Sequence, residues 1–437
     1  MHMLRPFMLL LLAGASYVAA QGTGLRLFFH LSYLLLGLLL LAAIWTWLNL
    51  RGLSIQRELL SPRATVGEYA RERITLANHW FLPKLWVEVS DESDLPQHGA
   101  GFVASLRGRE RGRWLARTLC TRRGRFRLGP ATLVSGDPFG IIALGRRVTS
   151  TNELLVYPRS ELLPHFTLPG ADLAGGQALR IRSFHSSPNV AGIREYAPGD
   201  GMNRIHWRST ARTGRLMVKE FELDPSAAIY LVLDMQERAV VQDARVHFDP
   251  QVDPRNTAPW WARQRNAELL EDRYLPSSEE SAVVITASLA RTLLAQNRSV
   301  GMIAWGQHRE VIPAEREARQ LPKILEALAV LRAYSAQSLA EVLLAESARF
   351  GRDTTLVIVT SSLDERWVGA LQQQLYRGIR AVVILVDPQS FGGWRDPETI
   401  LQHLAALRIT TYRVRQGDVL AEALRLPWAD AERRGRA

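Results

Sequence analysis

Asp234 is the residue of this sequence that is best placed for chemistry. It directly follows the apolar run from Ile229 to Leu233, and a short continuous apolar run is typical of a strand buried on both faces. Ligands of open α/β sheets bind beyond the carboxyl ends of the strands, and carboxylate oxygens are ligands that divalent cations prefer. Its position therefore makes Asp234 a candidate ligand for Mg²⁺.

Three more apolar runs would bring residues to the same edge of a sheet. They cover 300–305, 355–359 and 381–386, and Gly306, Ser361 and Asp387 stand at their ends. Amphipathic segments separate these runs, and strands that alternate with helices predict a parallel sheet covered on both faces. We therefore expect residues 227–437 to form a doubly wound α/β domain of the Rossmann type.

The segment 236–280 interrupts the first connection between strand and helix in this domain. It contains Trp260, Trp261 and many charged residues. A loop of about 45 residues is typical of a lid, a docking element or a disordered segment rather than of a core. We expect this insertion to lie beside the strand ends.

The common signatures of enzymes are missing from the sequence. It contains no G-x-x-x-x-G-K-[ST], H-E-x-x-H, G-x-S-x-G or paired C-x-x-C pattern. His185, Ser186 and Ser187 have the residue types of nucleophilic catalysis, but adjacency in a sequence does not position a triad. His206 stands among arginines, where a hydrogen-bonding role is commoner than that of a general base. We therefore predict a protein that performs no catalysis.

The segment 194–222 is rich in arginine, and its spacing predicts a short basic helix. Asp200 suits the start of a helix and Gly214 its end, with Arg204, Arg208 and Arg212 at helical spacing between them. Ile205 and Trp207 would anchor the helix in an apolar core. The strand from Leu216 to Phe221 would follow.

Three roles are open for these arginines. They could pair with neighbouring carboxylates and join two domains, dock a protein partner, or bind phosphate or nucleic acid; the planar guanidinium suits the first two through bidentate contacts. The candidate residues of this joint or docking site are Arg194, Glu195, Pro198, Gly199, Asp200, Arg204, Trp207, Arg208, Arg212 and Gly214.

Much of the net charge of +11 comes from residues 101–130, which contain nine arginines against one glutamate. Arg123, Arg125 and Arg127 recur at the period of a strand, so we expect them on one basic face. A solvated face near anionic lipid is the simplest interpretation, because basic residues gain about 1 kcal/mol each there. Nucleic-acid binding is the alternative, but few aromatic residues interleave the arginines.

Short alternating segments separated by turns extend from residue 54 to 160. Examples are 72–76, 85–89, 125–128 and 154–157. Two sheets can bury the alternating faces of such strands against each other. We therefore expect a β-sandwich of immunoglobulin-like type at 54–160, joined to the α/β domain by residues 161–226.

Residues 1–51 form a predicted membrane anchor with two apolar segments, 7–25 and 27–50. The second is long enough to cross a hydrocarbon core of about 30 Å. The first would form a helical hairpin with it or be a cleavable signal peptide. Three arginines follow the second segment, at 51, 57 and 63, so the positive-inside bias places the main body in the cytoplasm. The single Cys120 also suits a reducing compartment.

An Asp that ends the first strand of an α/β domain resembles the von Willebrand factor type A domain. The metal site of that family needs Asp-x-Ser-x-Ser after the first strand, a Thr from another loop and an Asp after a later strand. In this sequence Gln236 and Arg238 replace the two serines, the strand at 355–359 lacks the acidic residue, and Ser338 is the candidate for the Thr. The resemblance implies a degenerate site of Asp234, Ser338 and Ser361, with no cofactor or at most Mg²⁺.

A longer signature resembles the bacterial family called domain of unknown function 58. It consists of Arg194-Glu195-Tyr196, Pro198-Gly199-Asp200, Arg204-Ile205-His206-Trp207 and Ala211-Arg212-Thr213-Gly214, with Arg122 to Pro130, Asp137-Pro138-Phe139-Gly140 and Val156-Tyr157-Pro158-Arg159 upstream. The resemblance implies membrane helices, a β-rich region and a divergent type A domain. It also implies two partners, a MoxR-type AAA+ ATPase and a membrane protein with a transglutaminase-like domain.

These observations predict a scaffold or adaptor anchored in the bacterial inner membrane, with its body in the cytoplasm. The surface around Asp234, Ser338 and Ser361, together with segment 236–280, is the expected partner-facing region. A Mg²⁺-dependent binding or hydrolytic protein centred on Asp234 is one alternative. A basic nucleic-acid binder is the second.

Overall fold

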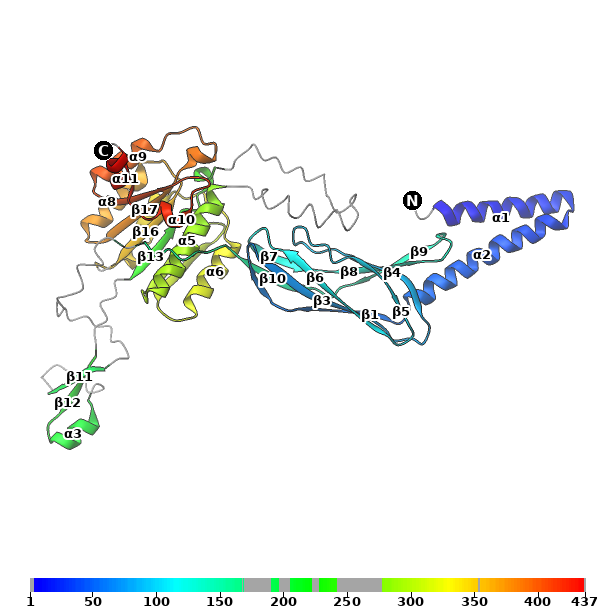
Figure 1. The fold of residues 1–437 in the computed structure, drawn as a ribbon, viewed down its shortest axis with the longest axis horizontal. Helices are drawn as coiled ribbons and strands as arrows, with labels where there is room; N and C mark the ends of the chain where they lie inside the picture. The colour runs from blue at the N-terminus through cyan, green and yellow to red at the C-terminus, as the bar shows by residue number, and fades with distance from the viewer. Residues whose placement is uncertain are drawn as a thin grey trace. The chain divides into compact units, whose positions relative to one another are not determined.

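The computed structural model describes residues 4–166, 168, 190–195, 205–221, 228–241, 277–352 and 354–435 (Figure 1). The chain divides into two compact units. The first is built on Met1–Ser160 and includes Pro322–Leu331. The second comprises Glu161–Val241, Ser277–Leu321 and Arg332–Ala437.

The first unit begins with two antiparallel helices, α1 (Leu4–Thr23) and α2 (Arg26–Leu50). Both are long and apolar enough to cross a membrane, with mean hydropathies of 1.3 and 2.3 over their apolar windows. The hydroxyl of Ser32 donates to the carbonyl of Ala13 at 3.0 Å, and that of Ser16 donates to the carbonyl of Phe28 at 3.0 Å. These bonds hold the helices side by side, and the two predicted apolar segments are confirmed as helices.

Three β-sheets follow the helices. The first has the order β1 (Leu53–Leu59), β3 (Tyr69–Asn78), β6 (Arg111–Leu119). The second has the order β5 (Phe102–Leu106), β4 (Lys84–Asp91), β8 (Ala131–Gly136), β9 (Ala143–Val148). The third has the order β2 (Arg63–Thr65), β10 (Asn152–Tyr157), β7 (Gly124–Leu128). All neighbours are antiparallel except β2 and β10.

The first two sheets share one apolar core. Alternate residues of their strands fill it, since the period of a strand places every second side chain on one face. Leu53 and Ile55 of β1 lie in the same cluster as Val87 and Val89 of β4. Leu50, the last residue of α2, also belongs to this cluster, so α2 is continuous with the core of the β-rich region.

A six-stranded sheet organises the second unit. Its order is β15 (Arg309–Glu315), β14 (Val300–Trp305), β13 (Ile229–Leu233), β16 (Thr355–Thr360), β17 (Arg380–Val386), β18 (Thr410–Val414). All neighbours are parallel except β14 and β15. Numbered along the chain the order is 3-2-1-4-5-6, so the topological switch point lies between β13 and β16.

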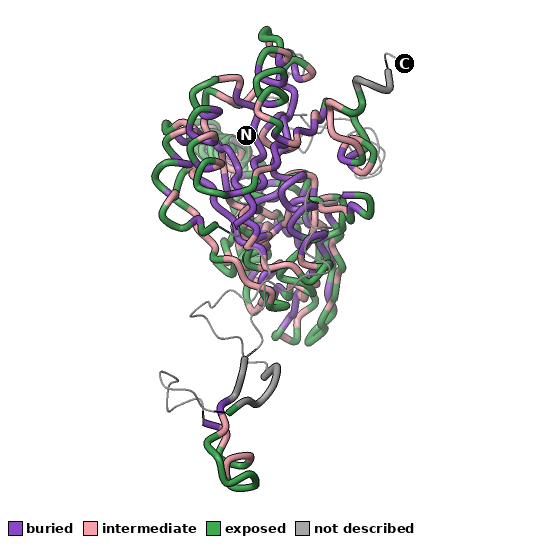
Figure 2. The backbone as a smooth tube through the Cα atoms, turned by 90° about the vertical axis from the view of Figure 1, so that its left-hand side faces the viewer, coloured by how far each residue is buried: buried purple, intermediate pink, exposed green. Residues whose placement is uncertain are grey.

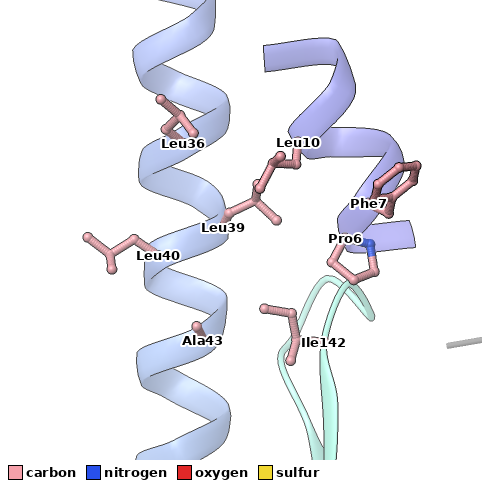
Figure 3. Close-up of a pocket in the computed structure, with 8 residues that line it drawn as sticks. All are labelled: Pro6, Phe7, Leu10, Leu36, Leu39, Leu40, Ala43 and Ile142. Carbon is pink, nitrogen blue, oxygen red and sulfur yellow. The ribbon is translucent and has the colours of Figure 1, made fainter. Parts of the chain in front are cut away.

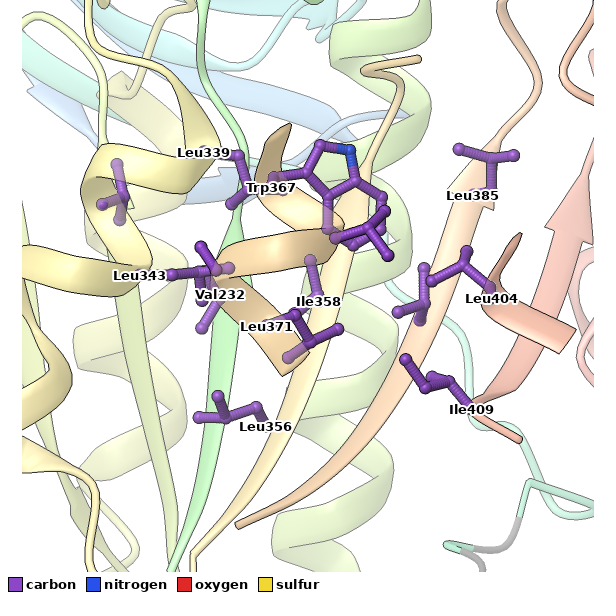
Figure 4. Packing of buried hydrophobic residues seen from close by; sticks show 14 of the residues in the cluster. Val232, Leu339, Leu343, Leu356, Ile358, Trp367, Leu371, Leu385, Leu404 and Ile409 are labelled. Carbon is purple, nitrogen blue, oxygen red and sulfur yellow. The ribbon is translucent and has the colours of Figure 1, made fainter. Parts of the chain in front are cut away.

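Helices cover both faces of this sheet. One face packs on α7 (Leu339–Ala345), α8 (Arg366–Tyr376) and α9 (Glu398–Ala406) through an apolar cluster that includes Val232, Ile358 and the fully buried Trp367 (Figure 4). Helix α5 (Ser278–Ala295) contacts β13, β14, β16 and β17 and contributes nothing to that cluster, so it covers the other face. The remaining helices are α6 (Gln320–Val330), α10 (Leu420–Ala423) and α11 (Trp428–Gly435). The predicted α/β sheet is confirmed.

Residues 190–195 and 205–221 form a small lobe. Strands β11 (Val190–Glu195) and β12 (Met217–Phe221) pair antiparallel, and α3 (Trp207–Thr213) precedes β12. None of the residues of α3 is buried (Figure 2).

Candidate functional site

Asp234 lies at the switch point, where the carboxyl ends of β13 and β16 meet. Its side chain is only 8% exposed. The hydroxyl of Thr360 donates to Oδ2 at 2.6 Å, and the backbone amide of Gln236 donates to Oδ1 at 3.1 Å. Both carboxylate oxygens are therefore engaged within the protein.

Burial raises the pKa of Asp234 above the ordinary value of a carboxyl group, because the charged form loses its hydration. The hydrogen bonds from Thr360 and Gln236 act in the opposite direction. The side chain that joins the ends of β13 and β16 is thus the carboxyl group of Asp234, and its hydrogen-bond donors are uncharged.

Of the two predicted companions of Asp234, the structure brings only Ser361 into its neighbourhood. Ser361 follows Thr360 and donates to the carbonyl of Ala239 at 2.7 Å. Ser338 instead begins α7, where it forms a capping box with Glu341. Its hydroxyl accepts the backbone amide of Glu341 at 3.3 Å, so Ser338 stabilises a helix rather than a metal ion.

Two residues that the sequence reasoning missed bind the Asp234 loop more closely. One is Thr360, the last residue of β16. The other is Ser335, which is buried and pairs with the loop through its backbone: its amide donates to the carbonyl of Met235 at 3.1 Å, and its carbonyl accepts the amide of Glu237 at 3.0 Å. Thr360 is the residue immediately before Ser361, so its position at the end of β16 could have identified it as a partner of Asp234.

Two other carboxylates near this edge are held by arginines. Asp387 lies 2.8 Å from the guanidinium of Arg413, and Asp364 lies 2.5 Å from that of Arg366. Among the residues that the structure describes, no group of three or more His, Cys, Asp and Glu side chains is arranged to hold a metal ion. A single buried carboxyl with bonded oxygens does not suit Mg²⁺, which requires near-octahedral oxygen ligands.

The loops around this closed edge expose large aromatic side chains. Trp394, in the loop between β17 and α9, is 83% exposed, and Tyr334, between α6 and α7, is 68% exposed. The guanidinium of Arg395 lies 4.7 Å from the ring centroid of Trp394. The pKa of Asp364 is held below its usual range mainly by the hydrogen bonds from Arg366, and the charge of Arg395 adds to this effect.

The arginine-rich segment is exposed rather than packed. Trp207 is 67% exposed, whereas Ile205 is 4% exposed, so only Ile205 is an apolar anchor and the prediction for Trp207 was wrong. Arg208 and Arg212 are also exposed, on α3. The helix begins after His206, whose ring accepts the amide of Ser209.

The remaining predicted residues of this segment are only partly described. Gly214 ends α3 in the left-handed conformation, with φ of 69°, as predicted. Glu195 pairs with Arg215 at 2.7 Å, and both side chains are exposed. Pro198, Gly199, Asp200, Arg204 and the side chain of Arg194 lie outside the described residues, as does the greater part of the 236–280 insertion.

The predicted basic face on β7 needs a correction. Arg125 and Arg127 are exposed, but Arg123 is 1% exposed and donates to the carbonyl of Leu331 at 2.8 Å. Arg123 precedes the strand, so the alternation of β7 does not govern it. A larger basic face lies on β3 and β6, where Arg71 is directly opposite Arg117.

A buried cluster of charged side chains lies inside the β-rich region. The side chains of Arg57, Glu72, Asp91 and His98 are each at most 3% exposed. Arg57 contacts Glu72 at 2.6 Å and Asp91 at 2.8 Å, and Nε2 of His98 lies 2.7 Å from Asp91. The sequence reasoning missed this cluster.

The pKa shifts of the cluster follow from mutual pairing that outweighs burial. Although burial acts against it, the hydrogen bonds from His98 and Arg57 hold the pKa of Asp91 at about 2. The pKa of Glu72 is also lowered, and that of His98 is raised by Asp91 and Glu72. The charged forms of Asp91, Glu72 and His98 are therefore all favoured.

A family model and a bacterial relative both match this chain. A family model described as "Protein of unknown function DUF58" matches residues 192–246, which contain the arginine-rich signature. Over 368 residues the chain is 23% identical to the uncharacterized protein YeaD of Bacillus subtilis (strain 168), with 82% of each chain covered.

Solved structures resemble only parts of the chain. The CARDB domain of the PF1109 protein from Pyrococcus furiosus, in complex with di-metal ions, covers 24% of this chain and 86% of its own at 15% identity, with a TM-score of 0.19. The Pseudomonas fluorescens alkylpurine DNA glycosylase AlkC, bound to DNA, covers 24% of this chain and 30% of its own at 17% identity, with a TM-score of 0.18. The signature and the Bacillus subtilis relative agree with the resemblance predicted from the sequence, and both support the DUF58 family.

Proposed function

We propose that this chain is a membrane-anchored scaffold or adaptor that binds other proteins and performs no catalysis. Its helices α1 and α2 anchor it in the bacterial inner membrane, with the main body in the cytoplasm. In this proposal the β-rich region is an immunoglobulin-like sandwich, and the α/β sheet is a divergent von Willebrand factor type A domain that binds partners without a metal ion.

The exposure of Trp394 and Tyr334 is the observation that carries the proposal. Their side chains are 83% and 68% exposed at the edge where α/β sheets bind ligands. Large aromatic residues supply most of the binding energy in protein interfaces when they are covered. Asp234 and Thr360, at the same edge of the sheet, are bonded to each other rather than free to bind a ligand.

The exposed face of α3 supports a second contact surface. Trp207 stands beside Arg208 and Arg212, and aromatic and arginine side chains are the types enriched in interfaces. The exposure of all three favours docking over the alternative in which they join two domains. The proposed partners are a MoxR-type AAA+ ATPase and a membrane protein with a transglutaminase-like domain, as the family resemblance implies.

Affinity isolation of the full chain from gently solubilised membranes tests this function. The Trp394→Ala, Tyr334→Ala variant should lose at least tenfold of the captured AAA+ ATPase, because losing about 1.4 kcal/mol of binding energy lowers affinity tenfold. Tyr376→Ala is the matched control, since Tyr376 is 82% exposed but ends α8, at the opposite edge of the sheet. Equal capture by all three proteins would contradict the proposed docking edge.

A further inference from the structure

The turn between β8 and β9 lies against the two apolar helices. The guanidinium of Arg5 donates to the carbonyl of Gly140 at 2.9 Å, and the hydroxyl of Thr46 donates to that of Ile142 at 3.4 Å. Ile142 also faces an open apolar pocket of about 770 Å³ (Figure 3). The pocket is lined by Pro6, Phe7 and Leu10 of α1, Leu36, Leu39, Leu40 and Ala43 of α2, and Ile142.

The position of this turn along α2 places it at the boundary of a hydrocarbon layer. Helix α2 begins at Arg26, and about 20 residues cross a core of about 30 Å. The crossing therefore ends near Trp45 and Trp47, which are 38% and 50% exposed and of the type that marks the membrane interface. Ala43, which lines the same pocket as Ile142, lies inside that limit, and Thr46, which bonds Ile142, lies at it.

The base of the hairpin lies at the end of α2. The guanidinium of Arg146 donates to the carbonyl of Leu53, just beyond the helix. From Ile142 to Arg146 an extended chain covers about 14 Å, and from Thr46 to Leu53 a helix covers about 10 Å. The hairpin therefore runs alongside the last turns of α2 for its whole outer length.

Three backbone amides of the turn are bonded within it, which lowers the cost of a lipid environment. The carboxylate of Asp137 accepts the amides of Phe139 at 2.8 Å and Ile142 at 2.5 Å. The amide of Gly140 donates to the carbonyl of Asp137 at 3.1 Å, and Pro138 has no amide hydrogen to satisfy. Asp137 itself is 7% exposed, so its charge is turned inward.

The side chains change from apolar to basic along the hairpin. Near the turn, Phe139 is 61% exposed and Leu144 is 42% exposed. At the base stand Arg146 and Arg147, also exposed. Basic side chains at the interface and apolar side chains beyond it are the arrangement of a membrane anchor. An uncovered apolar edge strand would otherwise invite aggregation.

We propose that the β8–β9 hairpin is a third membrane-embedded element, with lipid as its partner. Phe139 and Leu144 insert among the acyl chains beside α2, and Arg146 and Arg147 lie at the level of the headgroups. The inference rests on the proposed anchoring by α1 and α2. As a consequence, both α2 and the β8–β9 hairpin would attach the β-rich region to the bilayer.

Spin labels in the full chain test the inference. Cys120 is the single cysteine and is buried, so a Cys120→Ala background allows one label at a time. Phe139→Cys is compared with Leu34→Cys on α2 and with Leu115→Cys on the outer face of β6; the native side chains are 61%, 67% and 49% exposed. Each protein is reconstituted in vesicles of phosphatidylcholine and phosphatidylglycerol, and collisions with oxygen and with a water-soluble nickel chelate are measured.

The label at 139 should behave as the label at 34 does, with several-fold fewer nickel collisions than the label at 115 and more oxygen collisions. Leu144→Cys provides a second position with the same expectation. A label at 139 that follows the label at 115 would overturn the inference, and so would one shielded from both reagents, because the turn would then be covered by protein. If the label at 34 also meets the nickel chelate, the anchoring itself fails, which is a separate result.

Discussion

The buried charge cluster of the β-rich region allows a sharp prediction about stability. Replacing Asp91 by Asn keeps the shape of the side chain but removes the charge that Arg57 contacts at 2.8 Å and His98 at 2.7 Å. Glu72 alone would then balance two buried cations. Breaking a buried ion pair by removing one partner costs about 3 to 5 kcal/mol, because the other charge remains without compensation.

Hydrogen exchange of the full chain in detergent measures this loss locally, which matters because a protein of two units has no single free energy of unfolding. A loss of about 3 to 5 kcal/mol lowers protection by about two to three and a half orders of magnitude. The effect should appear in peptides of β1, β3 and β4, which carry the cluster, and should spare peptides of the α/β sheet.

Glu58→Gln is the matched control. Glu58 pairs with Arg73 at 2.9 Å on the surface of the same sheet, with side chains 65% and 43% exposed. An exposed pair contributes about 0 to 1 kcal/mol, so protection should fall less than about tenfold. If Asp91→Asn lowers protection no more than Glu58→Gln does, the cluster is not a unit of mutually dependent charges, and the reasoning is refuted.

Three further predictions follow from the same structure. The pKa of His98 is raised from 6.5 and that of Asp91 is lowered from 3.8 to about 2, so the cluster contributes its full stability between pH 3.8 and 6.5. This contribution is lost as the pH rises through the raised pKa of His98, and it is lost again as the pH falls toward 2. His98→Gln should therefore remove the loss of hydrogen-exchange protection at alkaline pH. Burial raises the pKa of Asp234, so ionisation of this carboxyl destabilises the folded state above pH 3.8. At pH 7 Asp234→Asn should be neutral or stabilising, whereas Asp234→Ala should lose about 1 to 3 kcal/mol of stability because it leaves the donors of Thr360 and Gln236 unpaired. Hydrogen exchange of β13 measures both variants, and an Asn variant as unstable as the Ala variant would count against this account. Ile205→Ala should destabilise the lobe by about 2 to 5 kcal/mol, whereas Trp207→Ala should change its stability by at most about 0.5 kcal/mol, as limited proteolysis of the lobe would reveal.

The strands of the α/β sheet could be predicted from the sequence because their environment dictates their composition. Each central strand is buried on both faces, so it is a continuous apolar run, as Thr355 to Thr360 illustrates with every residue buried. The position of Asp234 followed from the same pattern. Its partner Thr360 did not, because only the strand order places β16 beside β13, and a run of apolar residues contains no information about its neighbours.

The buried charge cluster escaped prediction although the sequence contains a signal for it. Arg57 follows Leu53 and Ile55 at the strand period, Glu72 precedes Ile74 and Leu76, and Asp91 follows Val87 and Val89. Each charge thus stands in phase with the apolar face of its strand, where a side chain must point into the core. Which charges meet there depends on how the two sheets pack, and no single strand determines that.

The cluster also explains a glycine in the upstream motif of the family. Gly129 has φ of 89°, which favours glycine, and a Cβ atom there would lie 2.6 Å from Nη1 of Arg57 and 2.6 Å from the carbonyl oxygen of Ser150. Its amide donates at 2.8 Å to Ser93, whose hydroxyl donates to Asp91 at 2.8 Å. Gly129 therefore leaves room for the buried guanidinium of Arg57, and its amide holds Ser93, which bonds the carboxylate of Asp91. Part of what looks like a functional signature in this sequence is the means of burying Arg57.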